Sequence, residues 1–465
     1  MKILIFIFLA SFLMGCATKL HGPEINHYGM AESGLDARTS ANFETTNGQT
    51  RYPIDLDTCL RLAAHRPLDI AASRAALDEA HAQAILAYER FLPVLSPGLR
   101  FWRLEGLTQG TEGNFVNVEK QNSFAGTLLN LKWPLGDAIF SALSSKKKYE
   151  AAQWTLQGTS RSVLLKLARA YFDLLKEDQS VQAVKLSVEI SEKLLKETEA
   201  AVTNGRGFQG DFLRVKAQWG HNQLESLKSR DALMQASNQL VWLLYLDPRI
   251  ELYPAQEKAI PIQMVFEKDL KKLLQSAYEE RPEVQEAKER LKATLYEKQG
   301  ATWGPLIPEI NLETSLGGLG PVFGDLEEQH IYQAILQWKI GPGGLLDLGR
   351  ERILSAQARS SEIKLDQVLQ RIGHEVKSFF DRAQSLEEQL KIAEQGVRDA
   401  EQSLTLNEER QAAGLGLLLE VIQAEESLTR SRLDYLNVIT EYNKTQFELL
   451  ISTGNLPGET QKEKN

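Results

Sequence analysis

Apolar residues recur in alternating steps of three and four along two long stretches of the chain. Twelve positions of the second stretch follow this rule without a break: Leu365, Leu369, Ile372, Val376, Phe379, Ala383, Leu386, Leu390, Ala393, Val397, Ala400 and Leu404. Such a seam averages 3.5 residues per turn and predicts a long helix that supercoils left-handedly against a neighbour. The same seam occurs 209 positions earlier, from Leu156 to Leu195, where Ser160, Glu177 and Ser191 interrupt it.

The first long helix is expected to run from about Ala138 to Thr203, because no proline interrupts residues 135–246. Its length would be roughly 100 Å at 1.5 Å per residue. Shorter helices are expected to flank it at Asp55–Leu92 and Asp211–Leu246. Since each of these is about half as long as the rod, we expect the two to stack end to end along it.

Strict alternation of apolar and other residues predicts β-strands between the helices. The apolar series are Ala125, Thr127, Leu129, Leu131 and Trp133, then Ile310, Leu312, Thr314 and Leu316, then Tyr332, Ala334, Leu336, Trp338 and Ile340. A less regular strand is expected at Leu99–Glu105. Alternation over about ten residues is typical of outer-membrane strands, although a soluble sheet with one wet face has the same pattern.

Four strands cannot close a barrel, and a bilayer does not tolerate unpaired backbone groups at open sheet edges. If these strands lie in a membrane, other copies of the chain must complete the barrel. Three chains would supply twelve strands, an even number of ordinary size.

The chain is also duplicated. Arg66-Pro67 and Arg281-Pro282 open similar segments, and Pro93 matches Pro308 at the same spacing. The repeated unit is helix, hairpin, long helix, turn and helix. The expected division is a signal peptide at 1–15, a lipidated extension at 16–52, repeats at 53–250 and 269–454 around a linker at 251–268, and a disordered tail at 455–465.

The N-terminus predicts export. Lys2 precedes an apolar run from Ile3 to Met14, which suits the core of a signal peptide and is too short to span a bilayer as a helix. The following Gly15-Cys16 resembles a bacterial lipobox, in which Cys16 would be acylated after cleavage. Ala17 after this cysteine implies sorting to the outer membrane. The alternative is an ordinary cleavage site beside an incidental cysteine.

Gly205, Gly207 and Gly210 spell G-x-G-x-x-G, a pattern that can bind a dinucleotide. That fingerprint requires a preceding strand, whereas a long helix is expected here. The matching turn of the second repeat keeps Gly414 and Gly416 but lacks the third glycine. We therefore interpret both as turns that end helices in left-handed backbone conformations. Asp211 is then expected to cap the next helix.

Charge and composition exclude several functions. The net charge of −9, without a basic patch, argues against a nucleic-acid partner. His21 and His27 lack a third ligand for a metal ion. No convincing nucleophile and base occur together, so we expect no enzyme activity, no cofactor and no metal site.

Taken together, these features resemble the TolC-like outer-membrane efflux proteins, in their lipoprotein branch. The resemblance covers about Tyr52 to Gly454 and rests on the duplicated unit, the Arg-Pro to Leu-Pro passages, the Trp-x-x-Gly strand ends and the glycine turns. It implies a mainly α fold with a membrane β part: a homotrimeric 12-stranded β-barrel, with 4 strands per chain, continued by a long periplasmic α-helical coiled-coil barrel. It also implies a passive duct in the outer membrane of a Gram-negative bacterium, loaded by an inner-membrane pump through a periplasmic adaptor.

The resemblance also assigns candidate site residues. The glycine turns would form the periplasmic tip, where either they contact the adaptor or they only turn the chain; they comprise Gly205, Arg206, Gly207, Gly414, Leu415 and Gly416. Acidic residues near the start of the last helix ring the tunnel in the family, and the gate positions matched here are Glu420 and Gln423, together with Asp211. A ring of Glu420 carboxylates would favour cations. Alternatively, Glu420 is only a first-turn residue stabilised by the helix dipole.

Some relatives keep an arginine in the second turn, where this chain has Gly416, so their salt-bridge lock is not expected here. Trp133 and Trp338 end corresponding strands and are either anchors at the lipid interface or ordinary sheet-packing residues.

Two other functions fit part of the pattern. A periplasmic adaptor is also helical and often lipidated, but it has a single hairpin beside a β domain. A structural coiled-coil lipoprotein would explain the seams but not the alternating hairpins with their matched tryptophans.

Overall fold

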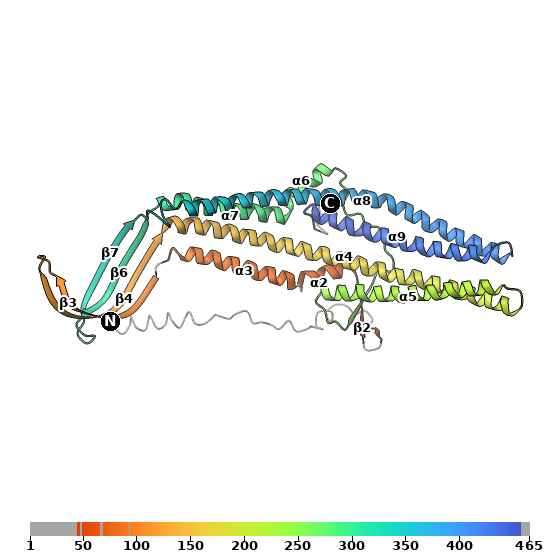
Figure 1. Ribbon diagram of the computed structural model, residues 1–465, viewed down its shortest axis with the longest axis horizontal. Helices are drawn as coiled ribbons and strands as arrows, with labels where there is room; N and C mark the ends of the chain where they lie inside the picture. The colour runs from red at the N-terminus through yellow and green to blue at the C-terminus, as the bar shows by residue number, and fades with distance from the viewer. Residues whose placement is uncertain (1–43, 47–48, 66–67, 93, 457–465) are drawn as a thin grey trace, which may run out of the picture.

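The computed structural model describes residues 44–46, 49–65, 68–92 and 94–456. The chain is strongly elongated, with a sheet at one end and long helices that run from it to two tight turns at the other end (Figure 1). The signal peptide, Cys16, His21, His27 and most of the predicted tail lie outside the described residues, so what we expect of them stays a prediction.

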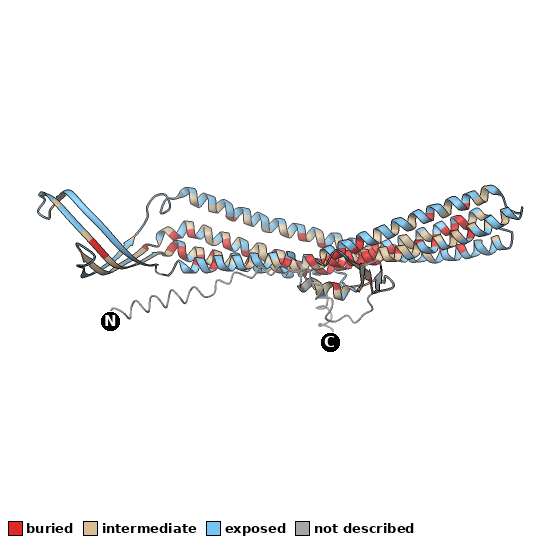
Figure 2. Cartoon of the chain, turned by 90° about the horizontal axis from the view of Figure 1, so that it is seen from below, coloured by how far each residue is buried: buried red, intermediate tan, exposed pale blue. Residues whose placement is uncertain are grey.

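Two long helices form the axis of the molecule: α4 (Leu135–Thr203) and α8 (Leu348–Ala412). All twelve seam positions of α8 are buried or half-buried, and so are the matching positions of α4. Both seams are therefore confirmed as packing faces. Figure 2 shows that buried residues concentrate midway along the helices, where the most segments meet.

Shorter helices cover these rods in pairs. On α4, α3 (Leu68–Glu89) packs along the half nearer the sheet and α5 (Gln209–Leu243) along the half nearer the turns. On α8, the same places are taken by α7 (Pro282–Trp303) and α9 (Leu418–Ser452). The expected end-to-end arrangement is thus confirmed.

The first helix of each repeat is divided in two. Before α3 comes α2 (Leu56–His65), and before α7 comes α6 (Leu270–Glu280), so the single helix expected at Asp55–Leu92 is wrong. In the second repeat the cause is Pro282 at the first position of α7, because proline disfavours helical backbone in the preceding residue. The extended Arg281 is held by its guanidinium, which donates to Glu283 at 3.0 Å and to Glu375 of α8 at 2.7 Å.

The helices form a single layer. Near the sheet, α3, α4, α7 and α8 make contact in this order, and toward the turns the order is α5, α4, α9 and α8. One edge of the layer therefore belongs to α3 and α5, and the other belongs to α8. No helix of the described chain is long and apolar enough to cross a membrane.

The sheet contains four antiparallel strands in the order β3 (Val94–Gln109), β4 (Phe115–Pro134), β6 (Glu309–Gly320) and β7 (Glu327–Gln337). The strand expected at Leu99–Glu105 is present and extends well beyond both predicted ends. The two hairpins of the duplicated unit are joined through β4 and β6, so β3 and β7 are the edge strands.

The strand register places the three alternating series on one face. Leu131 pairs with Leu312, which pairs with Ala334, and Trp133 pairs with Ile310, which pairs with Leu336. Directly paired residues lie on the same face of a sheet. The opposite face is polar at the helix end, where Glu309 lies 3.2 Å from both Lys132 and Lys339.

A second, small sheet joins the start of the first repeat to its end. It contains β1 (Glu44–Thr46), β2 (Gln49–Ile54) and β5 (Ile250–Pro254), with β2 parallel to β5. The sequence analysis assigned these segments to an extension and a linker and predicted no strands there. Leu252 of β5 and Ile54 of β2 enter the central core beside Leu167 of α4.

Two buried side-chain amides of α9 hold the segment between β5 and α6 in place by hydrogen bonds, a contact that we call the clasp. Asn443 accepts a hydrogen bond from the backbone N–H of Ile262 at 2.8 Å and donates to the carbonyl of Ile260 at 2.9 Å. Gln446 accepts from Met264 at 3.1 Å and from Val265 at 3.2 Å. This irregular segment therefore obtains backbone hydrogen bonds from side chains of the last helix.

We expect Asn443→Ala to release this segment, because two hydrogen bonds worth about 1 kcal/mol each are lost. Trypsin cleavage at Lys258 and Lys268 should then accelerate roughly 10- to 30-fold, as read from timed digests by mass spectrometry. The matched control is Asn407→Ala on α8, since Asn407 bonds only within its own helix, to Ser403. Equal cleavage rates in the two variants would contradict the clasp.

Candidate functional site

The two glycine turns lie together at the end of the molecule away from the sheet (Figure 1). Gly205 has φ +69° and Gly414 has φ +74°, the left-handed conformation that glycine adopts without strain. The N–H of Arg206 donates to the carbonyl of Ala201, and the N–H of Leu415 donates to that of Arg410, both at 2.9 Å. Both turns are therefore Schellman motifs, which satisfy carbonyls at a helix end.

The second glycine of each turn is needed for a close approach. A side chain at Gly207 would meet the backbone nitrogen of Val202 at 2.9 Å, and one at Gly416 would meet that of Gln411 at 3.0 Å. Because a helix, not a strand, precedes these glycines, the structure gives no support to a dinucleotide site.

Asp211 and Glu420 occupy equivalent positions in the two repeats. Each is the third residue of its helix, α5 or α9, and its N–H donates to the carbonyl of Phe208 or Leu417, respectively. The expectation that Asp211 is an N-cap is wrong, because the helix already begins at Gln209. Its carboxylate instead lies 3.3 Å from Arg214, one turn along α5.

Glu420 performs a local structural task. Its carboxylate accepts from the backbone N–H of Leu417 at 3.2 Å, which satisfies a donor that the helix start leaves open. The same carboxylate lies 3.8 Å from Arg410, in the last turn of α8. Gln423, one turn further along α9, is exposed. The hydrogen bond to Leu417 fits the alternative that Glu420 is a first-turn residue that stabilises the helix start. The gate role of Glu420, Gln423 and Asp211 stays a prediction.

The sequence analysis missed an apolar surface on the turns. Phe208 and Leu417 directly follow the second glycines and are 73% and 68% exposed. Leu415 and Leu213 are exposed beside them. Large exposed apolar side chains gathered at one end of a molecule are typical of a contact surface. The sequence contained a signal for this surface, because Phe208 and Leu417 are equivalent residues of the two repeats. Both follow a tight turn, where a large apolar side chain has no core to pack into.

A buried carboxyl group links the two repeats above these turns. Glu425 of α9 is buried and accepts hydrogen bonds from Ser187 of α4 and, at 3.2 Å, from Thr429. Burial is the main cause that raises the pKa of Glu425 above its ordinary value, and the neighbouring Glu426 raises it further. The sequence signal was a polar residue in the apolar stripe formed by Val421, Ile422 and Leu428.

The strand-ending tryptophans make the same bond in both repeats. The indole N–H of Trp133 donates to the carbonyl of Phe91 at 2.8 Å, and that of Trp338 donates to the carbonyl of Leu306 at 3.2 Å. Each bond ties a strand to the helix-to-strand passage of its own repeat. Their role as anchors at a lipid interface stays a prediction.

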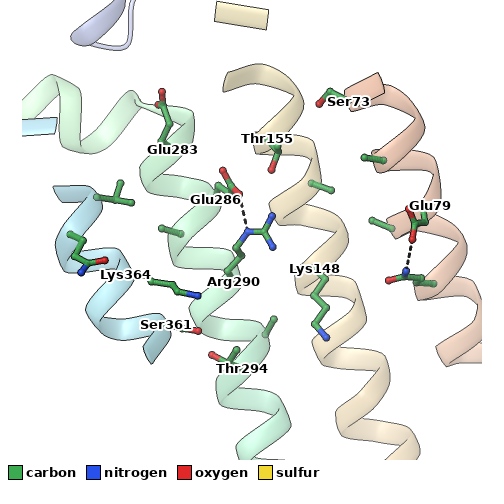
Figure 3. A pocket seen from close by; sticks show the side chains of 18 of the residues that line it. Ser73, Glu79, Lys148, Thr155, Glu283, Glu286, Arg290, Thr294, Ser361 and Lys364 are labelled. Carbon is green, nitrogen blue, oxygen red and sulfur yellow. Dashed lines mark hydrogen bonds and ion pairs between the residues drawn. The ribbon is translucent and has the colours of Figure 1, made fainter. Parts of the chain in front are cut away.

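Among the described residues, a cavity of 790 Å³ is lined by α3, α4, α7 and α8 (Figure 3). Its charged side chains have both signs, and Arg290 pairs with Glu286 at 2.8 Å. No group of three or more potential metal ligands occurs in the part of the chain that the structure describes. The cavity therefore favours no single class of ligand.

A duplicated chain with two rods of about 100 Å, a four-stranded sheet at one end and turns at the other defines an elongated protein built from two copies of one helix-and-hairpin unit. The chain belongs to the outer membrane efflux protein family, whose model matches residues 59–244 and 273–455. The resemblance and the mainly α fold with its internal repeat are thus confirmed. No curated protein matches the chain by sequence.

Solved structures show the same fold at low sequence identity. The outer membrane protein VceC from Vibrio cholerae is 18% identical, with a TM-score of 0.75 over 86% of this chain and 96% of its own. The CmeC outer membrane channel of Campylobacter jejuni is 14% identical, with a TM-score of 0.73 and 88% of each chain covered. The open state of the MtrE outer membrane channel of Neisseria gonorrhoeae is 16% identical, with a TM-score of 0.72 over 86% of this chain and 89% of its own.

Glu425 predicts a pH dependence. Its raised pKa means that the folded protein favours the protonated carboxyl, so its contribution to stability is present at low pH and is lost as pH rises through the folded pKa. We expect Glu425→Gln to reduce the fall in melting temperature between pH 5 and pH 8, measured by circular dichroism in detergent. Asp434→Asn, at an exposed position of the same helix, is the control. If parent and Glu425→Gln lose stability in parallel, Glu425 does not carry the effect.

Proposed function

We propose that this protein is the outer-membrane duct of a tripartite efflux or secretion system. Three copies would form a 12-stranded barrel with four strands from each, continued by a helical tunnel across the periplasm. The duct conducts substrate passively, and the inner-membrane pump supplies the drive. Cys16 carries the lipid anchor, and the repeats, linker and extension divide the chain as the sequence predicts.

The observation that carries this proposal is the four-stranded sheet with open edges. One face is apolar across β4, β6 and β7, and among the described residues no strand pairs with the outer edge of β3 or of β7. In lipid each unpaired backbone group costs several kcal/mol, so the edges require partner strands. The four strands of this sheet contain 11 to 20 residues, enough to cross a bilayer.

The adaptor is proposed to dock at the turns. The exposed Phe208 and Leu417 supply an apolar surface next to Leu415 and the other predicted contact residues. Such a surface on a solvent-exposed end is stabilised when a partner covers it. A structural coiled-coil lipoprotein needs neither this surface nor an apolar sheet face, and a single-hairpin adaptor does not match the duplicated fold.

The mass and shape of the detergent-purified full chain test the proposal. Light scattering should give three copies per particle, and negative-stain images should show a rod well beyond roughly 100 Å with a hollow end view. A monomeric or dimeric rod that stays soluble without detergent would overturn the barrel.

The gate proposal makes a separate prediction about selectivity. Three Glu420 carboxylates near the axis would favour cations, so Glu420→Gln should lower the cation-to-anion permeability ratio about 2- to 10-fold, measured by reversal potentials in planar bilayers. Glutamine can still accept the N–H of Leu417, which preserves the helix start. Glu408→Gln, on an exposed face of α8, is the control. Unchanged reversal potentials in both variants would place Glu420 away from the conduction path.

A further inference from the structure

The passage from the sheet to the long helix differs between the two repeats. In the first repeat, β4 ends at Pro134 and α4 begins at the next residue. In the second, a loop of residues 338–347 separates the end of β7 at Gln337 from the start of α8 at Leu348. The loop has the sequence WKIGPGGLLD, and its first four residues match Trp133 to Gly136 of the first repeat. The duplication does not account for the remaining residues, PGGLLD.

The loop is held in one shape by its own hydrogen bonds. The N–H of Gly341 donates to the carbonyl of Leu345 at 2.7 Å, and the N–H of Leu345 donates to that of Lys339 at 2.8 Å. The carboxylate of Asp347 accepts from the N–H groups of Gly343 at 2.8 Å and Arg350 at 3.0 Å. These hydrogen bonds connect residues near both ends of the loop to residues in its middle.

Within this frame, Leu346 adopts an unfavourable backbone conformation. Its φ is +76°, a region that costs a side chain with a Cβ atom about 1–2 kcal/mol relative to glycine. The side chain is 77% exposed, so packing within the described chain does not compensate for this strain. Backbone strain of this kind clusters at functional sites, so it is a reason to look for a function at Leu346.

The neighbouring side chains are also apolar and exposed. Ile340 is 76% exposed and Leu348 is 62% exposed, while Trp338 is half exposed. The two charged groups of the loop are both engaged, because Lys339 lies 3.2 Å from Glu309 and Asp347 binds backbone N–H groups. The loop consequently presents apolar side chains, while its own two charged groups are engaged.

These side chains continue the apolar face of the sheet. Tyr332 and Leu336 lie on that face of β7, and the same alternation reaches Trp338 and Ile340. Lys339, between the last two, reaches Glu309 on the opposite, polar face. Continuity with the proposed lipid-facing surface favours lipid as the partner over a soluble protein.

We infer that the loop between β7 and α8 is a lipid-contacting foot, in which Leu346, Ile340 and Leu348 enter the periplasmic-side boundary of the outer membrane. An apolar loop with no free charge is suited to the zone between headgroups and acyl chains. The inference rests on the proposed function, because it requires the sheet to lie in the bilayer. It adds a contact that the four strands do not make.

Lipid quenching tests the inference on the full chain reconstituted in phosphatidylcholine vesicles. Three single variants, Leu346→Cys, Tyr332→Cys and Ile392→Cys, are labelled with a thiol-reactive fluorophore and compared in ordinary and acyl-brominated lipid. Tyr332 reports on the sheet, and Ile392 is an exposed residue of α8 roughly 65 Å along the helix from the loop. The parent protein, labelled alike, gives the background; its Cys59 is fully buried and burial raises the pKa of that thiol to about 12.

Brominated lipid should lower the emission of the labelled Leu346→Cys and Tyr332→Cys variants about twofold and leave Ile392→Cys unchanged. Quenching at Tyr332→Cys alone overturns the foot and leaves the proposed function standing. In that case, a short crosslinker that joins unlabelled Leu346→Cys to a second copy would show that the neighbouring chain, and not lipid, covers the loop. If neither Tyr332→Cys nor Leu346→Cys is quenched, the sheet does not lie in lipid, and the proposed function is overturned as well. Equal quenching at Ile392→Cys shows adsorption of the whole rod and overturns the foot.

Discussion

The backbone groups on the outer sides of β3 and β7 constrain the rest of the structure. An edge strand presents a row of N–H and C=O groups that need partners, and four strands cannot curl far enough to satisfy their own edges. The helical layer repeats this order, because α3, α4, α7 and α8 follow one another as β3, β4, β6 and β7 do. A copy that pairs with one edge of the sheet therefore also reaches the corresponding edge of the helices.

Duplication explains why the same local structures occur twice in the fold. The two turns share their left-handed glycines, and the two tryptophans bond to equivalent carbonyls. The repeats are then joined by contacts that have no equivalent, such as Lys444 of α9 at 2.6 Å from Asp173 of α4 and the ion pair between Arg169 and Glu448. Such partly buried pairs add specificity to the junction, since each charge is expensive to leave alone.

Local periodicity made much of the fold predictable. The seam from Leu365 to Leu404, the alternating strands and the glycine turns are each encoded within a few dozen residues. The small sheet was not predictable in this way, because β2 and β5 are short and lie about 200 residues apart in sequence. The start of α5 was misplaced because Asp211 is a good capping residue, yet the glycine turn allows the helix to begin two residues earlier.

The candidate site was less predictable than the fold. Glycines that end helices can be recognised from residue type, but the exposure of Phe208 and the strain at Leu346 depend on the three-dimensional path of the chain. The burial of Glu425 depends on which helices meet at that level, and Ser187 is 238 residues away in sequence. Sequence patterns identify the elements, whereas these contacts require their assembly.

The central core also determines when the protein can finish folding. Phe447 and Ile451, from the end of α9, pack in the same cluster as Cys59 of α2 and Leu167 of α4. The first repeat therefore cannot complete its core until the last helix of the chain has been made. Contacts between distant parts of a chain form slowly, because a long loop must close before they contribute. A chain that is made from its N-terminus would thus carry an incompletely packed first repeat until α9 is released.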